Sequence, residues 1–189
     1  MPAEHPAEVP ADLPAQHPEV AAKALTVRRA RTSDVAAVRR LLDANVRRRI
    51  LLDKPTVTLY EDIQEFWVAE RGDNAEVVGC GALHVMWEDL AEVRTLAVNP
   101  TVKGLGVGHQ LLEKLLQTAR WLGVRRVFCL TFEVGFFAKH GFVEIGETPV
   151  DTEVYAELLR SYDEGVAEFL GLERVKPNTL GNSRMLLHL

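Results

Sequence analysis

One stretch, residues 92–116, constrains the fold of this chain more than any other. It reads EVRTLAVNPTVKGLGVGHQLLEKLL: an extended run to Val98, a glycine-rich turn at 103–108, and an amphipathic segment that begins at His109. A strand, a glycine turn and a helix N-terminus together favour an anion site. Glycine lets the backbone approach a phosphate, and the first N–H groups of a helix point towards it. The alternative at this point is a strand-to-helix connector that binds no ligand.

Composition narrows the classes of function. The 189 residues suit one domain with a substantial core. A formal net charge of −5 and a pI near 5.7 argue against a nucleic-acid-binding protein. Cys80 and Cys129 lie in apolar runs without metal-ligand spacing, which predicts buried thiols in a reducing compartment. No apolar run approaches the ~20 residues that span a bilayer. We therefore expect a cytoplasmic protein without a metal, a nucleic-acid partner or a membrane contact.

The first 24 residues differ from the rest of the chain. They hold five of the nine prolines, many alanines and scattered acids. Such a segment cannot bury enough apolar surface to offset its chain entropy, so we predict a disordered tail at 1–24 and one folded domain at 25–189. A docking arm is the alternative for the tail.

Hydrophobic periodicity in residues 25–189 predicts strands that alternate with helices. The expected strands are 25–30, 65–70, 77–86, 91–98, 127–132, 142–144 and 183–189. The expected helices are one capped at 32–34 that reaches the arginines at 47–49, then 58–63, 109–123, 133–139, and 152–170 with an interruption at Gly165. This order predicts an α/β fold in which a mixed sheet of six or seven strands carries helices on both faces.

Two motifs in register resemble the GNAT superfamily of acyl-CoA N-acyltransferases. The turn KGLGVG at 103–108 is similar to the family's coenzyme A pyrophosphate cradle, with Lys103 where the family has Gln or Arg. The segment FFAKHGF at 136–142 is similar to the second family motif, an aromatic pair followed by Gly-Phe. The resemblance covers about 25–189 and implies the GNAT fold and acetyl-CoA as co-substrate. The residues that it implies for binding the coenzyme are Leu96, Ala97, Val98, Lys103, Gly104, Leu105, Gly106, Val107, Gly108 and His109.

A narrower resemblance is to the acetyltransferase domain of N-acetylglutamate synthases. It rests on 92–98, 127–131 and 136–142, and segments 79–83 and 182–186 agree with it. Classical synthases place an amino-acid-kinase-like, arginine-binding domain before this module, for which this chain has no room. The chain therefore resembles the short actinobacterial amino-acid N-acetyltransferase at the start of arginine biosynthesis. The implied acceptor is L-glutamate, with L-glutamine also open, and a homodimer is open as well.

A base is needed because an α-ammonium, with a pKa of ~8, is mostly protonated at pH 7. Glu92 stands six residues before Val98, where several GNAT enzymes carry a general-base glutamate, and strand alternation places Glu92, Arg94, Leu96 and Val98 on one face. The alternative is that Glu92 is a structural ion-pair partner. Glu133 and His84 are weaker candidates for the base.

The resemblance also bears on the leaving group and on the acceptor. Many GNAT enzymes have a Tyr as general acid where this chain has Phe137, so that role is vacant. Two acceptor carboxylates call for cationic clamps. The candidate substrate-binding residues are Lys54, Arg94, Ser183 and Arg184. Asn182 replaces a substrate-binding Arg of the classical synthases, and the alternative for each cation is a solvated surface charge.

Two functions compete with acetylation of glutamate. One is acetyl transfer to another amine, and the other is a non-catalytic acyl-CoA sensor.

Overall fold

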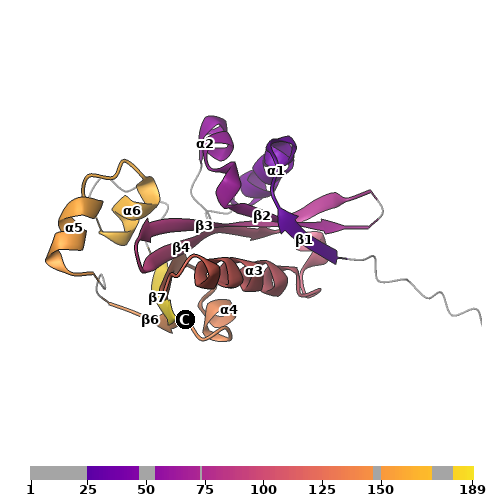
Figure 1. Ribbon diagram of the computed structural model, residues 1–189. Coiled ribbons are helices and arrows are strands. Elements are labelled where there is room, and N and C mark those ends of the chain that lie inside the picture. Colours follow the sequence, from indigo (N-terminus) through magenta and orange to yellow (C-terminus); the bar gives the residue numbers. More distant parts are fainter. Residues whose placement is uncertain (1–24, 47–53, 73, 147–149, 172–180) are drawn as a thin grey trace, which may run out of the picture.

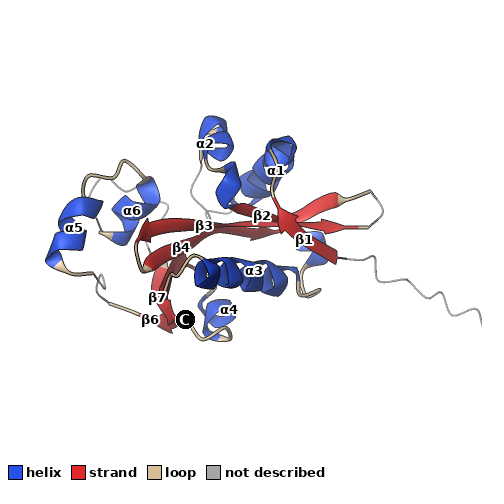
Figure 2. Ribbon diagram, viewed as in Figure 1, coloured by secondary structure: helices blue, strands red, loops and turns tan. Residues whose placement is uncertain are grey.

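The computed structural model describes residues 25–46, 54–72, 74–146, 150–171 and 181–189. They form a seven-stranded sheet in the order β1-β2-β3-β4-β5-β7-β6. Helices lie on both faces of the sheet (Figure 1, Figure 2). The predicted α/β fold with a mixed sheet is thus confirmed. The tail predicted at 1–24 and the arginines at 47–49 lie outside the described residues.

The strands match the sequence prediction to within one or two residues. They are β1 Leu25–Arg29, β2 Phe66–Arg71, β3 Glu76–Trp87, β4 Leu90–Val98, β5 Arg126–Thr131, β6 Val143–Glu144 and β7 Ser183–His188. Every neighbouring pair is antiparallel except β4 and β5, which are parallel. The β4–β5 ladder joins only Leu90–Glu92 to Arg126–Phe128. Beyond Glu92 the two strands no longer pair, so the β5-facing edge of β4 is left for another partner.

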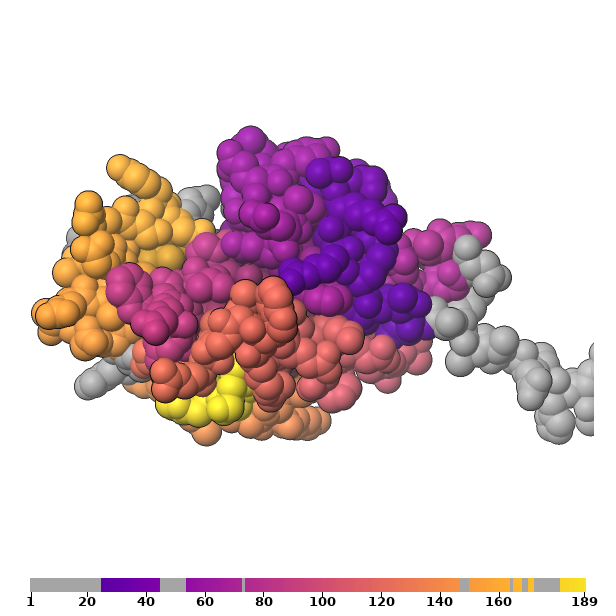
Figure 3. Space-filling view, viewed as in Figure 1, coloured from indigo at the N-terminus to yellow at the C-terminus, as the bar shows by residue number. Residues whose placement is uncertain are grey.

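The helices divide between the two faces and one end of the sheet. They are α1 Val35–Val46, α2 Thr56–Glu61, α3 Val107–Trp121, α4 Val134–Ala138, α5 Thr152–Leu158 and α6 Glu164–Phe169. Short 3₁₀ turns lie at Thr32–Asp34, Ile63–Glu65 and Pro100–Val102. In Figure 1, α1 and α2 cover one face and α3 and α4 the other. The α5–α6 segment, orange in Figure 3, forms one end of the molecule.

Helix α3 packs closely on the sheet because its apolar stripe meets a strand with little side-chain bulk. The stripe of the predicted amphipathic helix is buried, and its residues are Leu111, Leu112, Leu115, Leu116 and Ala119. A Cβ at Gly79 of β3 would lie 2.9 Å from Leu111 Cδ1, and one at Gly81 would lie 3.1 Å from Leu115 Cδ1. The strand glycines therefore permit the close helix–sheet contact that fixes the N-terminus of α3 beside β4. Cys80 and Cys129 are both buried free thiols, as predicted.

The prediction that Glu92, Arg94, Leu96 and Val98 share one strand face is wrong. The β3–β4 register passes from Cys80↔Ala97 to Ala82↔Arg94, so two β4 residues oppose Gly81. Thr95, at this bulge, has a φ of 60°. One extra residue reverses the alternation of side chains. Arg94 therefore contacts the α2 side of the sheet, whereas Leu96 and Val98 pack on the α3 side.

The helix predicted at 152–170 is two short helices, and Gly165 does not mark the break. Asp151 starts α5 by accepting a hydrogen bond from the Val154 N–H at 2.9 Å. Asp163 accepts one from the Val166 N–H at 3.0 Å at the start of α6. An aspartate that caps a helix competes with continuation of the preceding one, which explains the interruption. Gly165 lies inside α6.

Candidate active site

The glycine turn exposes the N-terminus of α3. Gly106 is the N-cap, with a φ of 76°, and no side chain caps the helix there. Gln110 N–H bonds to the Gly106 carbonyl at 3.0 Å, so the N–H groups before Gln110 precede the intrahelical ladder. A left-handed conformation suits glycine, and the helix dipole favours an anion at this end. The helix begins at Val107, two residues before the prediction.

The turn, the open edge of β4 and α4 meet around Gly108. A Cβ at Gly108 would lie 3.7 Å from Val98 Cγ2 and 3.5 Å from the ring of Phe136. Leu96 and Val98 are half-buried and Ala97 is buried. The structure thus brings the predicted coenzyme-binding strand and turn together. These features fit coenzyme A: free N–H groups suit its pyrophosphate, and an unpaired strand edge suits its pantetheine arm.

Two further predicted turn residues, Lys103 and Leu105, are exposed, and Leu105 is 55% exposed. His109 Nδ1 lies 2.8 Å from His140 Nε2. His140 Nδ1 in turn bonds to the Phe136 carbonyl at 2.8 Å. Sequence reasoning did not assign His140 a place at the site, although it belongs to the FFAKHGF motif that carried the resemblance.

Glu92 lies in a buried ionic cluster on the other face of the sheet. It is 4% exposed, and its Oε2 is buried and accepts no hydrogen bond from the described residues. Burial raises the pKa of Glu92 to about 7; the nearby Asp163 adds to the rise, and the cations Arg94 and Lys54 oppose it. A carboxyl group in this state can exchange a proton near neutral pH.

Arg94 holds the cluster together. Its Nη1 lies 2.9 Å from Asp163 Oδ2, and its Nη2 lies 3.0 Å from Glu65 Oε2. Nη2 is also 3.4 Å from Asp62 Oδ2, and Nη1 is 3.9 Å from Glu92 Oε2. A substrate carboxylate would have to displace one of these partners, so the role of Arg94 as a clamp stays a prediction. A buried arginine with carboxylate partners is a strong organiser, because removing it leaves charges uncompensated.

Three of these carboxylates were missed in the sequence. Asp62 and Glu65 follow α2 in a short 3₁₀ connection, and Asp163 lies in the break between α5 and α6. Asp163 was hidden by the prediction of one helix through that region. No local spacing relates the three to Arg94, from which they are separated by 32, 29 and 69 residues. Only the packing of α2 and α6 over β4 brings them together.

The predicted acceptor clamps are distributed over two faces. Lys54 Nζ lies 3.9 Å from Asp62 Oδ2, beside the cluster. In β7, Leu186 packs with Leu90 of the Glu92 face, so Arg184, two residues away, shares that face. Ser183 faces the opposite side, and its Oγ donates to Glu144 Oε1 at 2.7 Å. The structure therefore places Lys54, Arg94 and Arg184 on the Glu92 face of the sheet and Ser183 on the opposite face.

The other candidate bases differ sharply in placement. His84 is the register partner of Glu92 across β3 and β4, and its Nδ1 lies 2.8 Å from Glu65 Oε1. Glu133 is exposed at the N-cap of α4, and no hydrogen bond or ion pair joins it to Glu92. Phe137 is buried and packs edge-on against Phe142, which gives the aromatic residue at the vacant acid position a core role.

Helix α6 passes directly over Glu92. A Cβ at Gly165 would lie 2.8 Å from Glu92 Oε2 and 3.0 Å from Asp163 Oδ1. Glycine at this position is therefore a steric requirement for keeping the carboxylate where it is. In the sequence Gly165 stands out only as a predicted interruption of a helix. Its steric role becomes apparent only from the contact between α6 and Glu92.

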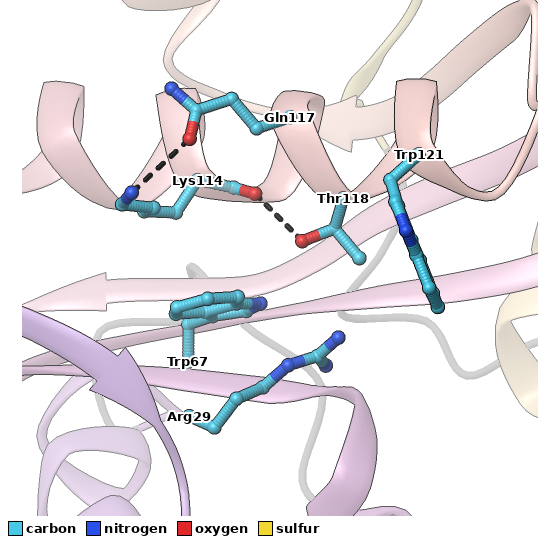
Figure 4. Close-up of a pocket in the computed structure, with 6 residues that line it drawn as sticks. All are labelled: Arg29, Trp67, Lys114, Gln117, Thr118 and Trp121. Carbon is cyan, nitrogen blue, oxygen red and sulfur yellow. Dashed lines mark hydrogen bonds between the residues drawn. The ribbon is translucent and has the colours of Figure 1, made fainter.

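A separate cavity of about 340 Å³ lies on the α3 side of the sheet. Figure 4 shows its lining, in which Trp67 and Arg29 face α3. The Arg29 guanidinium lies 4.8 Å from the centre of the Trp67 ring, a cation–π contact. None of the predicted site residues line this cavity, whose lining residues are Arg29, Trp67, Lys114, Gln117, Thr118 and Trp121. It is distinct from the cluster around Glu92.

Comparison with known proteins decides the family. The model of the acetyltransferase (GNAT) family matches residues 36–142, more than half of the chain. The chain belongs to the GNAT acetyltransferase family. An amino-acid acetyltransferase of Mycobacterium tuberculosis is 62% identical to this acetyltransferase over 162 residues, which cover 85% of this chain and 92% of the relative. An amino-acid acetyltransferase of Salmonella typhi is 32% identical over 73% of this chain, which spans only 30% of that relative's length.

Solved structures agree with this assignment. One is the crystal structure of Rv2747 from Mycobacterium tuberculosis in complex with CoA and NLQ. It matches this chain with a TM-score of 0.84 and 62% identity, and the match covers 87% of this chain and 99% of the Rv2747 chain. A second structure is an N-acetylglutamate synthase from Neisseria gonorrhoeae complexed with coenzyme A and N-acetyl-glutamate. Its TM-score is 0.68 at 24% identity, and the match covers 88% of this chain and 35% of the synthase chain. This similarity shows a shared fold.

The family and the relatives establish the reaction class. This acetyltransferase is an acetyl-CoA-dependent amino-acid N-acetyltransferase. Within the described ranges, no three His, Cys, Asp or Glu side chains gather in a way that could hold a metal ion. In the same ranges no helix has the length and apolarity needed to cross a membrane.

Proposed function

We propose that this acetyltransferase moves the acetyl group of acetyl-CoA to the α-amino group of L-glutamate, giving N-acetylglutamate and CoA as the first step of arginine biosynthesis. L-Glutamine is the alternative acceptor. The observation that carries the proposal is Glu92, a buried carboxyl group with a raised pKa in a cluster of cationic and acidic side chains, on the strand whose edge beyond Glu92 does not pair with β5. The Mycobacterium and Neisseria relatives support the acceptor class.

The coenzyme is held by backbone. N–H groups from Gly104 to His109 would bind the pyrophosphate, except that of Leu105, which donates to the Val102 carbonyl at 3.2 Å. Lys103 would add charge, and the β4 backbone from Leu96 to Val98 would pair with the pantetheine arm. Acetyl-CoA supplies the acetyl group as a thioester. An amide near Leu96 or Ala97 would stabilise the developing oxyanion, a contribution worth about 3–4 kcal/mol in comparable sites.

Glu92 accepts a proton from the acceptor ammonium. A base works best when its pKa lies near the operating pH, and the pKa of Glu92 is about 7. The neutral amine then has a free lone pair for attack on the thioester. Phe137 occupies the position of the family's general acid, and its buried phenyl ring has no proton to donate to the departing thiolate. A CoA thiolate is a tolerable leaving group without one.

The acceptor carboxylates would be bound by cations on the Glu92 face. Lys54 has only a 3.9 Å contact with Asp62 in the described ionic network, so its ammonium is well suited to exchange partners. Arg184 shares the face, and Arg94 would hold a carboxylate by giving up one of its present partners. Ser183 enters the proposal only through the resemblance, because its hydroxyl is bonded to Glu144. A homodimer and a cytoplasmic location stay predictions.

A thiol-release assay tests the function. Purified protein is given acetyl-CoA and each of the 20 amino acids, with and without arginine, and free CoA is measured. We expect turnover with glutamate, with glutamine as the second acceptor. Turnover only with amino acids other than glutamate and glutamine would contradict the proposed acceptor. Tight acetyl-CoA binding by isothermal titration with no thiol release from any amino acid would favour a sensor.

A further inference from the structure

We propose that His84 and Glu65 form an imidazole–carboxylate pair that carries the acceptor's proton from Glu92 to solvent. Glu65 acts as the positioning residue, and His84 acts as the relay. The inference rests on the proposed acetylation, because that reaction makes Glu92 take up a proton in each turnover. A base whose side chain is only 5% exposed needs a route by which that proton leaves.

The contact with Glu65 decides the tautomer of His84. His84 Nδ1 lies 2.8 Å from Glu65 Oε1. An ionised carboxylate only accepts hydrogen bonds, so Nδ1 carries the proton and donates it. In the neutral imidazole, Nε2 then has a lone pair and is the nitrogen that accepts. A carboxylate that fixes an imidazole in this way also stabilises the imidazolium that forms when Nε2 takes up a proton.

Strand register places this imidazole opposite Glu92. His84 of β3 pairs directly with Glu92 of β4. Directly opposite residues project from the same face, with Cβ atoms about 5 Å apart, which is close enough for a proton to pass between the two side chains directly or through one bridging water. Glu92 Oε2 has no hydrogen-bond partner among the described residues, His84 included. The side chain of Glu92 is 5% exposed and that of His84 is 22% exposed, so the pair leads from the buried base towards the surface.

Glu65 remains ionised in this arrangement. Burial alone would raise its pKa, but the bond to His84 and the charge of Arg94 lower it further than burial raises it. Its second oxygen lies 3.0 Å from Arg94 Nη2. The charged groups around His84 are Glu65 from the 3₁₀ turn, Glu92 from β4 and Asp163 before α6, together with the Arg94 guanidinium that Glu65 and Asp163 share.

The protons balance as follows. The acceptor ammonium loses two protons when its nitrogen becomes an amide N–H. The first passes to the Glu92 carboxylate, then to His84 Nε2, and then to water, which restores Glu92 as a carboxylate and His84 as the neutral tautomer. The second becomes the thiol proton of CoA. No oxidation or reduction is involved, and one proton is released to solvent in each turnover.

The decisive variant is Glu65→Gln, because a glutamine amide can donate to Nδ1 and so place the imidazole proton on Nε2. We expect a 10- to 100-fold lower kcat with glutamate near neutral pH, partial recovery at alkaline pH, and an unchanged KM for acetyl-CoA. His84→Gln, which leaves the Glu65–Arg94 pair intact, should show the same loss. The double variant should show no further loss, because the two residues act as one unit.

Asp62→Asn is the matched control. Asp62 contacts the same Nη2 atom of Arg94 at 3.4 Å, and no hydrogen bond joins it to His84. We expect this variant to alter the KM for glutamate while its kcat keeps the wild-type pH profile. Thermal unfolding of each variant separates a folding defect from a lost relay, and His84→Gln still tests the relay if Glu65→Gln does not fold.

Each outcome decides one of the two proposals. An active wild-type enzyme whose Glu65→Gln and Asp62→Asn variants lose kcat equally, with the same pH profile, overturns the relay alone. Additive losses in the double variant do the same. If the wild-type enzyme releases no thiol with any of the amino acids, the proposed function is overturned and the relay falls with it.

Discussion

At the scale of single residues, Glu92 shows how burial sets chemistry. Its carboxyl group has lost its solvent shell, and its nearest cation, Arg94, is shared with Glu65, Asp62 and Asp163. The attraction of Arg94 therefore offsets only part of the desolvation. The result is a glutamate whose pKa approaches 7 rather than its usual 4.5. Such perturbed groups are typical of catalytic sites, although ion-pair networks also produce them.

The raised pKa makes a prediction about stability. Between pH 4.5 and pH 7 the folded protein keeps a proton on Glu92 that the unfolded chain releases, so stability falls as pH rises through this window. Glu92→Gln is uncharged at every pH, so relative to wild type it should gain on the order of 1–3 kcal/mol between pH 4.5 and pH 8. Urea unfolding at a series of pH values measures this difference.

Glu133→Gln, at an exposed glutamate, is the control for the loss of one negative charge. If Glu92→Gln is instead destabilised more at pH 8 than at pH 5, the ionised carboxylate stabilises Arg94 by more than its own burial costs. The structural ion-pair interpretation of Glu92 would then be preferred to that of a base.

At the scale of elements, helix α3 packs on the sheet and presents an uncapped N-terminus, which is the proposed anion site. Its apolar stripe anchors it on β3, and its N-terminus begins at a left-handed glycine. A second left-handed glycine, Gly123, follows its C-terminus with a φ of 84°. At both glycines an added Cβ would meet no atom within 4 Å. The two positions thus have the same local strain and differ only in the end of the helix at which they lie.

Gly106→Ala and Gly123→Ala should therefore cost similar stability, about 1 kcal/mol each, because an L-residue is strained in the left-handed region. Only Gly106→Ala should weaken acetyl-CoA binding, since it alters the backbone at the N–H groups that receive the pyrophosphate. Chemical denaturation and isothermal titration measure the two quantities. An equal loss of affinity in both variants would show that helix stability, rather than the cradle, controls binding.

At the scale of the whole molecule, the sheet joins two half-sites on opposite faces. The turn before α3 lies on one face, and the Glu92 cluster lies on the other, beneath α2 and α6. The β4–β5 ladder ends at Glu92. In the proposed reaction, coenzyme and acceptor approach from different sides of the sheet and meet near the β4 bulge, where Thr95 has its unusual backbone conformation.

Coenzyme binding should stabilise the whole fold. CoA at 100 times its dissociation constant adds about 2.7 kcal/mol to the free energy of unfolding, which raises the Tm of a domain of this size by roughly 5–10 °C. Differential scanning fluorimetry measures the shift. Pantetheine, which lacks the pyrophosphate, should give a smaller shift at the same concentration. Hydrogen exchange should slow at residues 94–98, and unchanged exchange there would contradict pairing of the coenzyme with β4.

Local patterns were sufficient for much of the fold and for half of the site. Apolar periodicity predicted the strands and α3, and the glycines at 104–108 predicted the exposed N-terminus of α3, because both depend on neighbours in sequence. Alternation failed at Thr95, where a bulge inserts one residue without any break in the apolar pattern. The α5–α6 break was misplaced because aspartate caps, rather than Gly165, determine it.

The sequence by itself determined the proposed coenzyme side of this protein: backbone N–H groups of a turn and a helix need only a local run of glycines to be exposed. Tertiary structure decided the acceptor side. It set Glu92 and Arg94 on the opposite face from Leu96 and Val98, and it brought Asp62, Glu65 and Asp163 to one guanidinium. The charge and the proton affinity of Glu92 depend on the burial of its carboxyl group and on those long-range contacts. No spacing along the chain encodes them.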